Sequence, residues 1–354
     1  ARPEYTWSPV MPDVLNTDTI VRLTDEDGHQ GIGSVCTFTE FGTDASALAA
    51  MRPLAIGLLG RGPLAPADHW EWMQQRRPGV TNVAIAGFDI ALWDLAARRR
   101  GVPLCDLIGG KRDRMPVYAS VPVMDTPEQY VTLIGELAAG GITAFKFHYK
   151  SVAARDIAVI EAVSDAFRDT KLRFMFDAEG QYAPADALAV AQVMENRGYL
   201  WLEAPFDDHD WGAYRDLKAR VTLPIIPAGN SVVDASHVAQ AIRAGCWSTL
   251  RIDAATAGGI TPARQIFQMA GRSGLNVELQ SWGSSLSTAG NLHLALAHEN
   301  SAFFEIPVPR GDFELPGAES LMVAPDGTVA APDAPALGLA VDWAWFEDAA
   351  SDRA

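Results

Sequence analysis

The chain has 354 residues, of which 48% are hydrophobic and 20% charged, so we expect a folded protein of about two domains rather than a disordered one. Lys and Arg number 28 and Asp and Glu 44, which gives a net charge of −16. This excess of acid argues against nucleic acid or an anionic membrane as a partner. Without a long apolar run or paired cysteine motifs, the sequence favours a cytoplasmic protein in a reducing compartment.

The first part of the chain predicts a small α+β unit. Alternating apolar residues over 18–23 and 31–35, with a turn at 25–28, are typical of a β-hairpin. Apolar residues at helical spacing over 83–96 predict a helix that Gly101 and Pro103 would end. We place residues 1–114 in an N-terminal capping domain.

From Val117 onward, short apolar strands alternate with helical patterns. The eight predicted strands are Val117–Val121, Ala144–Tyr149, Leu172–Asp177, Leu200–Glu203, Pro224–Ala228, Thr249–Asp253, Val277–Gln280 and Ala302–Glu305. This alternation requires parallel pairing, and eight units close a barrel. The predicted fold is α/β: a (β/α)8 TIM-like barrel over 115–312, capped by the N-terminal domain and by the segment 313–354, which returns to the cap.

Polar side chains recur where the predicted barrel strands end, about one strand–helix unit apart. They are Lys146, His148, Asp177, Glu203, Asn230, Asp253, Gln280 and Glu305. The active sites of such barrels lie at this end. Capping of the following helices could explain individual Asp or Asn residues, but it does not explain the two Glu residues.

Three of these residues, Asp177, Glu203 and Asn230, follow consecutive strands and can converge. All three offer oxygen ligands, which suit Mg²⁺, whereas zinc is disfavoured because no Cys or His stands there. Buried polar packing is the alternative.

Lys146 and His148 are two residues apart on one predicted strand and should point the same way. They could simply fill the barrel. However, a buried lysine is costly without an anion, so we favour a functional role.

Several segments resemble the enolase superfamily, in particular its mandelate racemase and acid-sugar dehydratase branch. They are residues 81–94 (TNVAIAGFDIALWD), 103–110, 176–180 (FDAEG), 201–205 (WLEAP) and 251–261. In this order and spacing the resemblance covers nearly the whole chain. It implies a carboxylate substrate, such as a sugar acid, bound on one Mg²⁺, which stabilises the enediolate formed when the neighbouring proton is removed. It also implies a homo-oligomer.

The resemblance also implies roles for individual residues. Asp177, Glu203 and Asn230 would bind the metal, Lys146 would hold the substrate carboxylate and His148 would be the base. Glu305 would bind the carboxylate as a protonated acid, which needs a raised pKa; an ion pair with Arg251 or Lys146 is the alternative. Predicted substrate-binding residues are Glu179, Arg251, Gln280 and Trp282, with Tyr5 and Trp7 in a loop that closes the site.

The sequence departs from the usual pattern of the branch at three positions. Asn230 replaces a Glu, as in glucarate dehydratases, and His148 replaces the second Lys of a Lys-x-Lys pair. Gln280 stands where a His would pair with Asp253, and Gln does not carry protons at neutral pH. The muconate-lactonising branch would need Lys at position 253. His293 could substitute, but a packed helix histidine is the favoured interpretation.

One proton carrier suffices for a syn dehydration, whereas racemisation needs one on each face of the substrate. The sequence therefore favours a Mg²⁺-dependent dehydratase, a carbon–oxygen lyase, acting on a sugar acid or another small hydroxy-carboxylate. An epimerase, racemase or cycloisomerase on the same scaffold is the first alternative. An inactive carboxylate-binding barrel is the second.

Overall fold

The structure is a computed structural model that describes residues 6–8, 16–38, 43–62, 65–76, 79–110, 112–310, 314 and 321–350. The predicted hairpin is confirmed and is longer than the sequence pattern indicated, since β1 (Asn16–Thr24) pairs antiparallel with β2 (Gln30–Phe38). Asp25 accepts the backbone N–H of Gly28, whose φ of 84° lies in the left-handed region that the turn requires. No helix within these ranges is long and apolar enough to cross a membrane.

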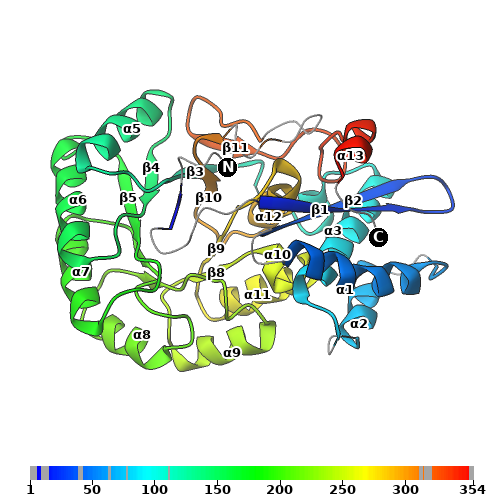
Figure 1. The fold of residues 1–354 in the computed structure, drawn as a ribbon, viewed down its shortest axis with the longest axis horizontal. Coiled ribbons are helices and arrows are strands. Elements are labelled where there is room, and N and C mark those ends of the chain that lie inside the picture. The colour runs from blue at the N-terminus through cyan, green and yellow to red at the C-terminus, as the bar shows by residue number, and fades with distance from the viewer. Residues whose placement is uncertain are drawn as a thin grey trace.

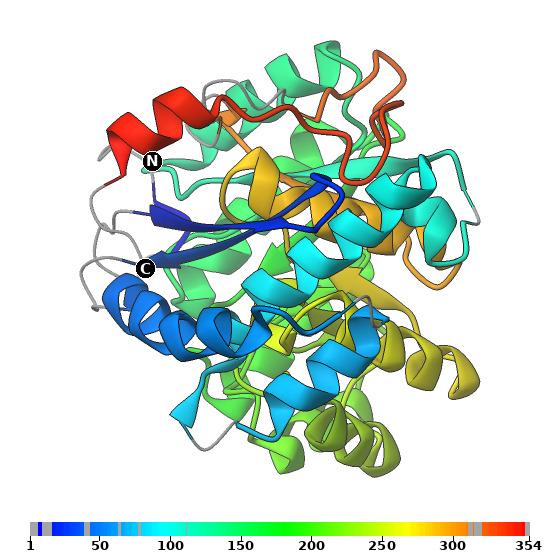
Figure 2. The ribbon, with the colours of Figure 1, turned by 90° about the vertical axis from the view of Figure 1, so that its right-hand side faces the viewer.

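The capping unit packs its hairpin against helix α3 (Asn82–Arg100). Thr81 caps the start of α3 by accepting the N–H of Ala84, and Gly101 ends it as predicted. A Cβ on Gly33 would lie 2.1 Å from the backbone oxygen of Gly87, so this contact requires glycine in β2. Figure 2 shows the hairpin in front, with α1 (Thr43–Leu58) and α2 (Pro66–Gln74) beside α3; the short α4 (Leu104–Leu107) leads into the barrel.

All eight predicted barrel strands are present (Figure 1). They are β3 (Arg114–Val121), β4 (Ala144–Phe147), β5 (Arg173–Asp177), β6 (Leu202–Glu203), β7 (Ile225–Ile226), β8 (Leu250–Ile252), β9 (Val277–Leu279) and β10 (Phe304–Pro307). Adjacent strands pair in parallel from β7 through β3 and β10 to β8. On the remaining side Ser248 donates its N–H to the Ile225 carbonyl at 2.9 Å, so the barrel is nearly closed.

Helices surround the barrel and bury its outer face. They are α5 (Pro127–Ala139), α6 (Ala153–Ala166), α7 (Pro184–Asn196), α8 (Trp211–Lys218), α9 (Ala235–Ala244), α10 (Ala254–Ala257), α11 (Ile260–Arg272) and α12 (Ser285–Ala297). Phe145 and Phe147 belong to the main hydrophobic core. They alternate along β4 with Lys146, which therefore points to the barrel interior.

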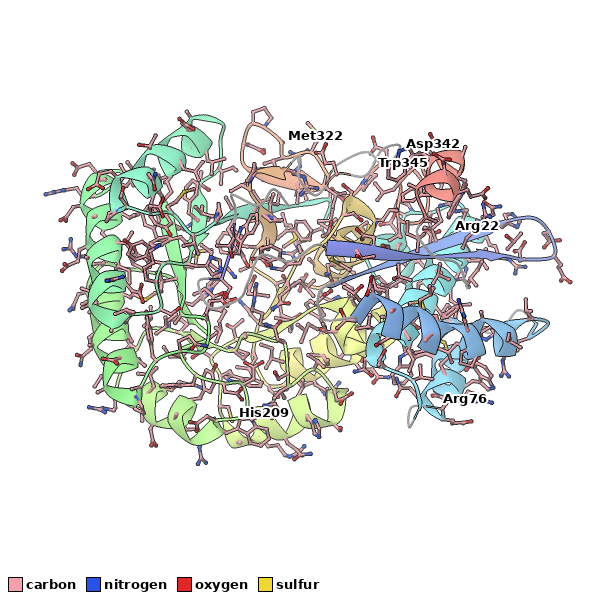
Figure 3. The ribbon with its side chains drawn as sticks, viewed as in Figure 1. Arg22, Arg76, His209, Met322, Asp342 and Trp345 are labelled. Atoms are coloured by element: carbon pink, nitrogen blue, oxygen red, sulfur yellow. The ribbon has the colours of Figure 1, made fainter. Side chains whose placement is uncertain are left out.

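The C-terminal segment contacts both units. Strand β11 (Thr328–Ala330) pairs antiparallel with the start of β3, a strand that the sequence analysis did not predict. Helix α13 (Trp343–Ala349) reaches the capping hairpin, where Arg22 lies 3.2 Å from Glu347 and 4.4 Å from the Trp343 ring. Figure 3 shows Arg22 and Trp345 at this end of the molecule and His209 at the lower edge of the barrel.

Buried aspartates connect the capping unit to the rest of the chain. Asp89 on α3 accepts the N–H and hydroxyl of Thr261 at the start of α11, at 2.8 and 2.7 Å. Asp94 accepts the N–H groups of Ile32 and Leu337 at 3.0 and 2.8 Å. These bonds fix the cap over the barrel.

Candidate active site

Lys146 lies at the centre of a buried cluster of charges inside the barrel. Its Nζ is 2.8 Å from Glu203 Oε1, 3.2 Å from Glu305 Oε1 and 3.3 Å from Asp177 Oδ2. The Lys146 side chain is 2% exposed, so the carboxylates replace the water that an ammonium group needs. Because an ammonium group has three N–H donors and each faces a carboxylate, a substrate would have to compete for Lys146.

Arg251 is the second buried cation of the cluster and enters from β8, across the barrel from Lys146. Its Nε lies 2.7 Å from Glu203 Oε1 and its Nη2 lies 2.8 Å from Glu305 Oε2, while Nη1 donates to Tyr118 Oη at 2.9 Å. Glu203 therefore lies between Lys146 and Arg251. Nη1 and Nη2 of Arg251 are thus hydrogen-bonded to Tyr118 and Glu305, and Nε forms an ion pair with Glu203.

The geometry favours the ion-pair alternative for Glu305 over a protonated acid. Burial alone would raise its pKa, but the Arg251 guanidinium and the Lys146 ammonium outweigh this and lower the pKa to about 2. Glu305 is thus ionised and paired with both cations, which was the alternative prediction. In this state it cannot donate a hydrogen bond to a substrate carboxylate.

The cluster contains more carboxyl groups than cations. Asp177, Glu203, Glu305 and the nearby Glu179 are carboxyl groups, whereas Lys146 and Arg251 are the cations. Burial, with Asp177 adding to it, raises the pKa of Glu203 to about 8 against the effect of the cations. A divalent cation bound among these carboxyl groups would offset the repulsion between them. Carboxylate oxygens are the ligands that Mg²⁺ prefers. The residues present therefore fit the predicted metal.

His148 follows β4 directly, and its ring lies beside the same carboxylates. Val121 O lies 3.2 Å from Nδ1, which leaves Nε2 as the basic nitrogen, 3.3 Å from Asp177 Oδ2 and 3.7 Å from Glu179 Oε1. Lys146 and His148 thus point the same way, as predicted. His148, Asp177 and Glu179 could also hold a metal together, but a nitrogen donor suits Mg²⁺ less well than oxygen.

Asn230 and Gln280 form a second arrangement at the ends of β7 and β9. Gln280 donates through Nε2 to the carbonyl of Ala228 at 2.5 Å and to Asn230 Oδ1 at 2.9 Å. Asn230 itself is exposed. The sequence predicts that Gln280 binds substrate hydroxyls, but its amide N–H groups are directed to protein oxygens.

Asp253 caps the helix that follows it, which was the alternative explanation for the Asp residues at strand ends. It caps α10 by accepting the N–H of Ala255 at 3.0 Å, and it also accepts from Asn291 Nδ2 at 2.8 Å. Asn291 donates to the backbone oxygen of Gln280 as well. His293 is fully buried and its Nδ1 accepts the N–H of Cys105, which agrees with a packed helix histidine.

A short N-terminal segment lies against the barrel mouth. Trp7 donates its indole N–H to the backbone oxygen of Ser120 at 3.1 Å, and its ring meets Trp282 edge-on at 5.1 Å. Ser8 hydrogen-bonds the Glu179 carboxylate. Trp7, Trp282 and Glu179 are thus brought together as the predicted closing loop requires; Tyr5 lies outside the described residues.

The sequence analysis missed several residues that form hydrogen bonds to the site residues or to their backbone. Asp208 is buried and accepts the N–H groups of Ala228, Asn230 and Ser231. Trp201 donates to Glu203 Oε2 at 3.2 Å, and its position two residues before Glu203 on a strand was a usable signal. Asn291, a polar residue in an apolar helix, was another.

Two family profiles match most of the chain. "Enolase C-terminal domain-like" matches residues 129–345, and "Mandelate racemase / muconate lactonizing enzyme, N-terminal domain" matches residues 15–109. A solved structure of the mandelate racemase/muconate lactonizing enzyme type from Pseudovibrio sp. superposes with a TM-score of 0.94 at 36% identity. The match covers 98% of this chain and 93% of that one.

Relatives with named activities are more distant. The structure of D-glucarate dehydratase from Agrobacterium tumefaciens complexed with magnesium has a TM-score of 0.80 and 27% identity, covering 94% and 90% of the two chains. L-talarate/galactarate dehydratase of Salmonella typhimurium is 27% identical over 81% of this chain and 72% of its own length. Relatives of similar identity include a D-galactarolactone cycloisomerase of Agrobacterium fabrum, at 25%. The chain therefore belongs to the mandelate racemase/muconate lactonizing enzyme family of the enolase superfamily.

Proposed function

We propose that this protein is a Mg²⁺-dependent dehydratase of a sugar acid or a similar polyhydroxylated carboxylate. The observation that supports this most directly is the asymmetry of the site. His148 faces the buried carboxylates from β4, whereas Arg251, Asp253 and Gln280 at the ends of β8 and β9 include neither lysine nor histidine.

Asp177, Glu203 and Asn230 would hold the metal. Mg²⁺ bound there supplies positive charge where the substrate carboxylate becomes more negative as the neighbouring proton leaves. Lys146 would bind the substrate carboxylate in competition with Asp177, which makes the longest of its three contacts. Arg251 keeps Glu305 ionised and holds Glu203 in place.

His148 would perform both proton transfers. Nε2 takes the proton from the carbon next to the carboxylate, and the same imidazolium then protonates the hydroxyl group that leaves the next carbon as water. The enol that remains tautomerises to a 2-keto-3-deoxy acid. Because one group serves both steps, proton and hydroxyl depart from the same face.

The same asymmetry disfavours epimerisation, which needs a proton carrier on the opposite face. Arginine does not deprotonate in proteins, and the Asp253 carboxylate already accepts hydrogen bonds from Asn291 and its own helix. Cycloisomerisation, the reaction of one relative, remains the second candidate because it also needs only one face.

The test is incubation of the purified protein and Mg²⁺ with a panel of sugar acids. We expect a 2-keto acid from at least one of them. His148→Asn should lower kcat at least about a hundredfold, the usual contribution of a positioned acid–base group. His29→Asn is the matched control, because His29 is exposed in the turn of the capping hairpin, where it pairs with Asp25.

The stereochemistry separates the candidates. In deuterated water, an analogue that lacks the leaving hydroxyl should exchange its proton with retention. Recovery of the inverted isomer would favour the epimerase, and a lactone product would favour cycloisomerisation. Mg²⁺ binding without turnover of any acid would favour the inactive barrel.

A further inference from the structure

The amide groups of Gln280 and Asn230 have a fixed relative orientation. Gln280 Nε2 lies 2.5 Å from the Ala228 carbonyl oxygen, which can only accept a hydrogen bond. The nitrogen of the Gln280 amide must therefore face Ala228. Its other N–H is directed to Asn230 at 2.9 Å, so the atom that Asn230 turns toward Gln280 must be its oxygen.

The backbone that sets this orientation is itself held firmly. Asp208 accepts the N–H groups of Ala228 and Asn230 at 2.8 and 3.1 Å and is 3% exposed. Gly229, with a φ of 75°, brings the chain so close to β8 that a Cβ would lie 2.4 Å from the Arg251 carbonyl oxygen. The Ala228 carbonyl is thus a rigid reference point, whereas the exposed Asn230 side chain is free to rotate unless something holds it.

Gln280 also has a fixed place relative to the charged cluster. Its N–H donates to the Ile252 carbonyl at 2.8 Å, and the N–H of the next residue, Ser281, donates to Glu305 Oε2 at 3.3 Å. The side chain therefore connects the Asn230 loop to the strand ends that carry the cluster.

We propose that Gln280 is a positioning residue that holds the Asn230 amide with its oxygen, rather than its NH₂ group, in place to bind Mg²⁺. The inference rests on the proposed role of Asn230 as a metal ligand. An amide oxygen has two acceptor positions, and Gln280 uses one of them. A neutral ligand needs this control more than a carboxylate does, because rotation by 180° replaces its oxygen with a group that does not bind cations.

The proposal predicts that the effect of replacing Gln280 depends on which residue stands at position 230. A loss of packing alone would not produce this dependence. Gln280→Met removes the donor at similar length, and loss of such a supporting contact typically weakens metal binding about 10- to 100-fold. In an Asn230→Asp background both rotamers of residue 230 present an oxygen. There, Gln280→Met should weaken Mg²⁺ binding less than about threefold.

The experiment is isothermal titration of MgCl₂, without substrate, into the wild-type protein, Gln280→Met, Asn230→Asp and the double variant. Circular dichroism verifies folding, and Gln280→Leu replaces Gln280→Met if the latter does not fold. A large effect in the wild-type background and a small one in the Asn230→Asp background supports the proposal. Equal effects in both backgrounds, or no effect in either, overturn it.

A separate variant tests the assumption beneath the proposal. If Asn230→Ala leaves Mg²⁺ affinity unchanged, Asn230 is not a ligand and the proposed metal set fails together with this inference. The dehydratase assignment fails differently, through absence of a 2-keto acid product while Mg²⁺ binding and its dependence on Gln280 persist.

Discussion

Lys146 and Arg251 stabilise the site by pairing with carboxylates that would otherwise be buried without a counter-charge. Such pairs contribute little net stability compared with a well-packed apolar core, but removal of one partner is severe because the other charge stays buried. Single-residue changes in this cluster should therefore alter stability and chemistry together.

Lys146→Met is expected to lower the free energy of unfolding by about 3–5 kcal/mol, because three carboxylates lose their shared cation. Turnover of the acid substrate should fall as well, since substrate and transition state both carry the carboxylate. Urea unfolding at pH 7 and steady-state kinetics measure the two effects. Lys171→Met, at an exposed position, is the control and should change neither; unchanged kinetics in Lys146→Met would make Lys146 structural.

Glu305 should give a measurable acid dependence. Its pKa is about 2 in the folded protein against an ordinary value of 4.5, so the folded state keeps it ionised where the unfolded chain takes up a proton. Its contribution is present above pH 4.5 and is lost as pH falls toward 2. The free energy of unfolding of Glu305→Gln should therefore decline less steeply over this interval than that of the wild type; parallel curves would contradict the ion pairing.

The charge state of Glu305 shows what sequence reasoning can and cannot reach at this scale. Strand-end spacing predicted which polar residues to consider, and the structure places Lys146, His148, Asp177, Glu203 and Glu305 in one cluster. The sequence left open whether Glu305 is protonated or paired with Arg251 or Lys146, because that depends on side-chain direction within a closed barrel. The low pKa of Glu305 depends on both cations, Arg251 first and Lys146 second.

At the level of elements, the junction between α3 and α11 determines how the cap sits on the barrel. Asp89 receives two hydrogen bonds from Thr261, and Gly259 just before α11 approaches the same carboxylate. A Cβ at Gly259 would lie 2.2 Å from Asp89 Oδ2, and its φ of 118° is unfavourable for other residues.

Gly259→Ala should therefore destabilise the protein by more than about 2 kcal/mol, the sum of backbone strain and a steric clash at a buried carboxylate. Gly109→Ala is the matched control. Its φ of 124° imposes a similar strain, but no atom lies within 4 Å of the added Cβ. Chemical unfolding of both variants measures the difference, and equal losses would show that the contact with Asp89 is unimportant.

Prediction of helices and strands succeeded where the apolar pattern was repetitive and failed at the ends of strands. The eight barrel strands and the hairpin follow from apolar periodicity, but residues 200–203 form a ladder only over Leu202–Glu203. Strand ends depend on which neighbours hydrogen-bond, and that is set by the barrel as a whole. Strand β11 was missed because Thr328–Ala330 is a three-residue edge strand whose partner lies more than two hundred residues earlier.

For the whole molecule, the net charge of −16 opposes the approach of an anionic substrate. Raising the salt concentration from about 20 to about 200 mM shortens the screening length roughly threefold. At saturating Mg²⁺, kcat/KM for a dicarboxylate sugar acid should therefore rise with salt, and more than for a monocarboxylate. A decrease would mean that local cations at the barrel mouth dominate the long-range field.

Asp94 has a consequence for how the chain is made. Its carboxylate joins Ile32 to Leu337, one partner from the first hairpin and one that leaves the ribosome some three hundred residues later. Until Leu337 is synthesised, the Asp94 carboxylate on α3 lacks one of its hydrogen-bond donors. The cap therefore cannot reach its final packing before then. The barrel strands, whose neighbours follow one another in sequence, can pair in the meantime. We therefore expect the unit that is synthesised first to be completed last.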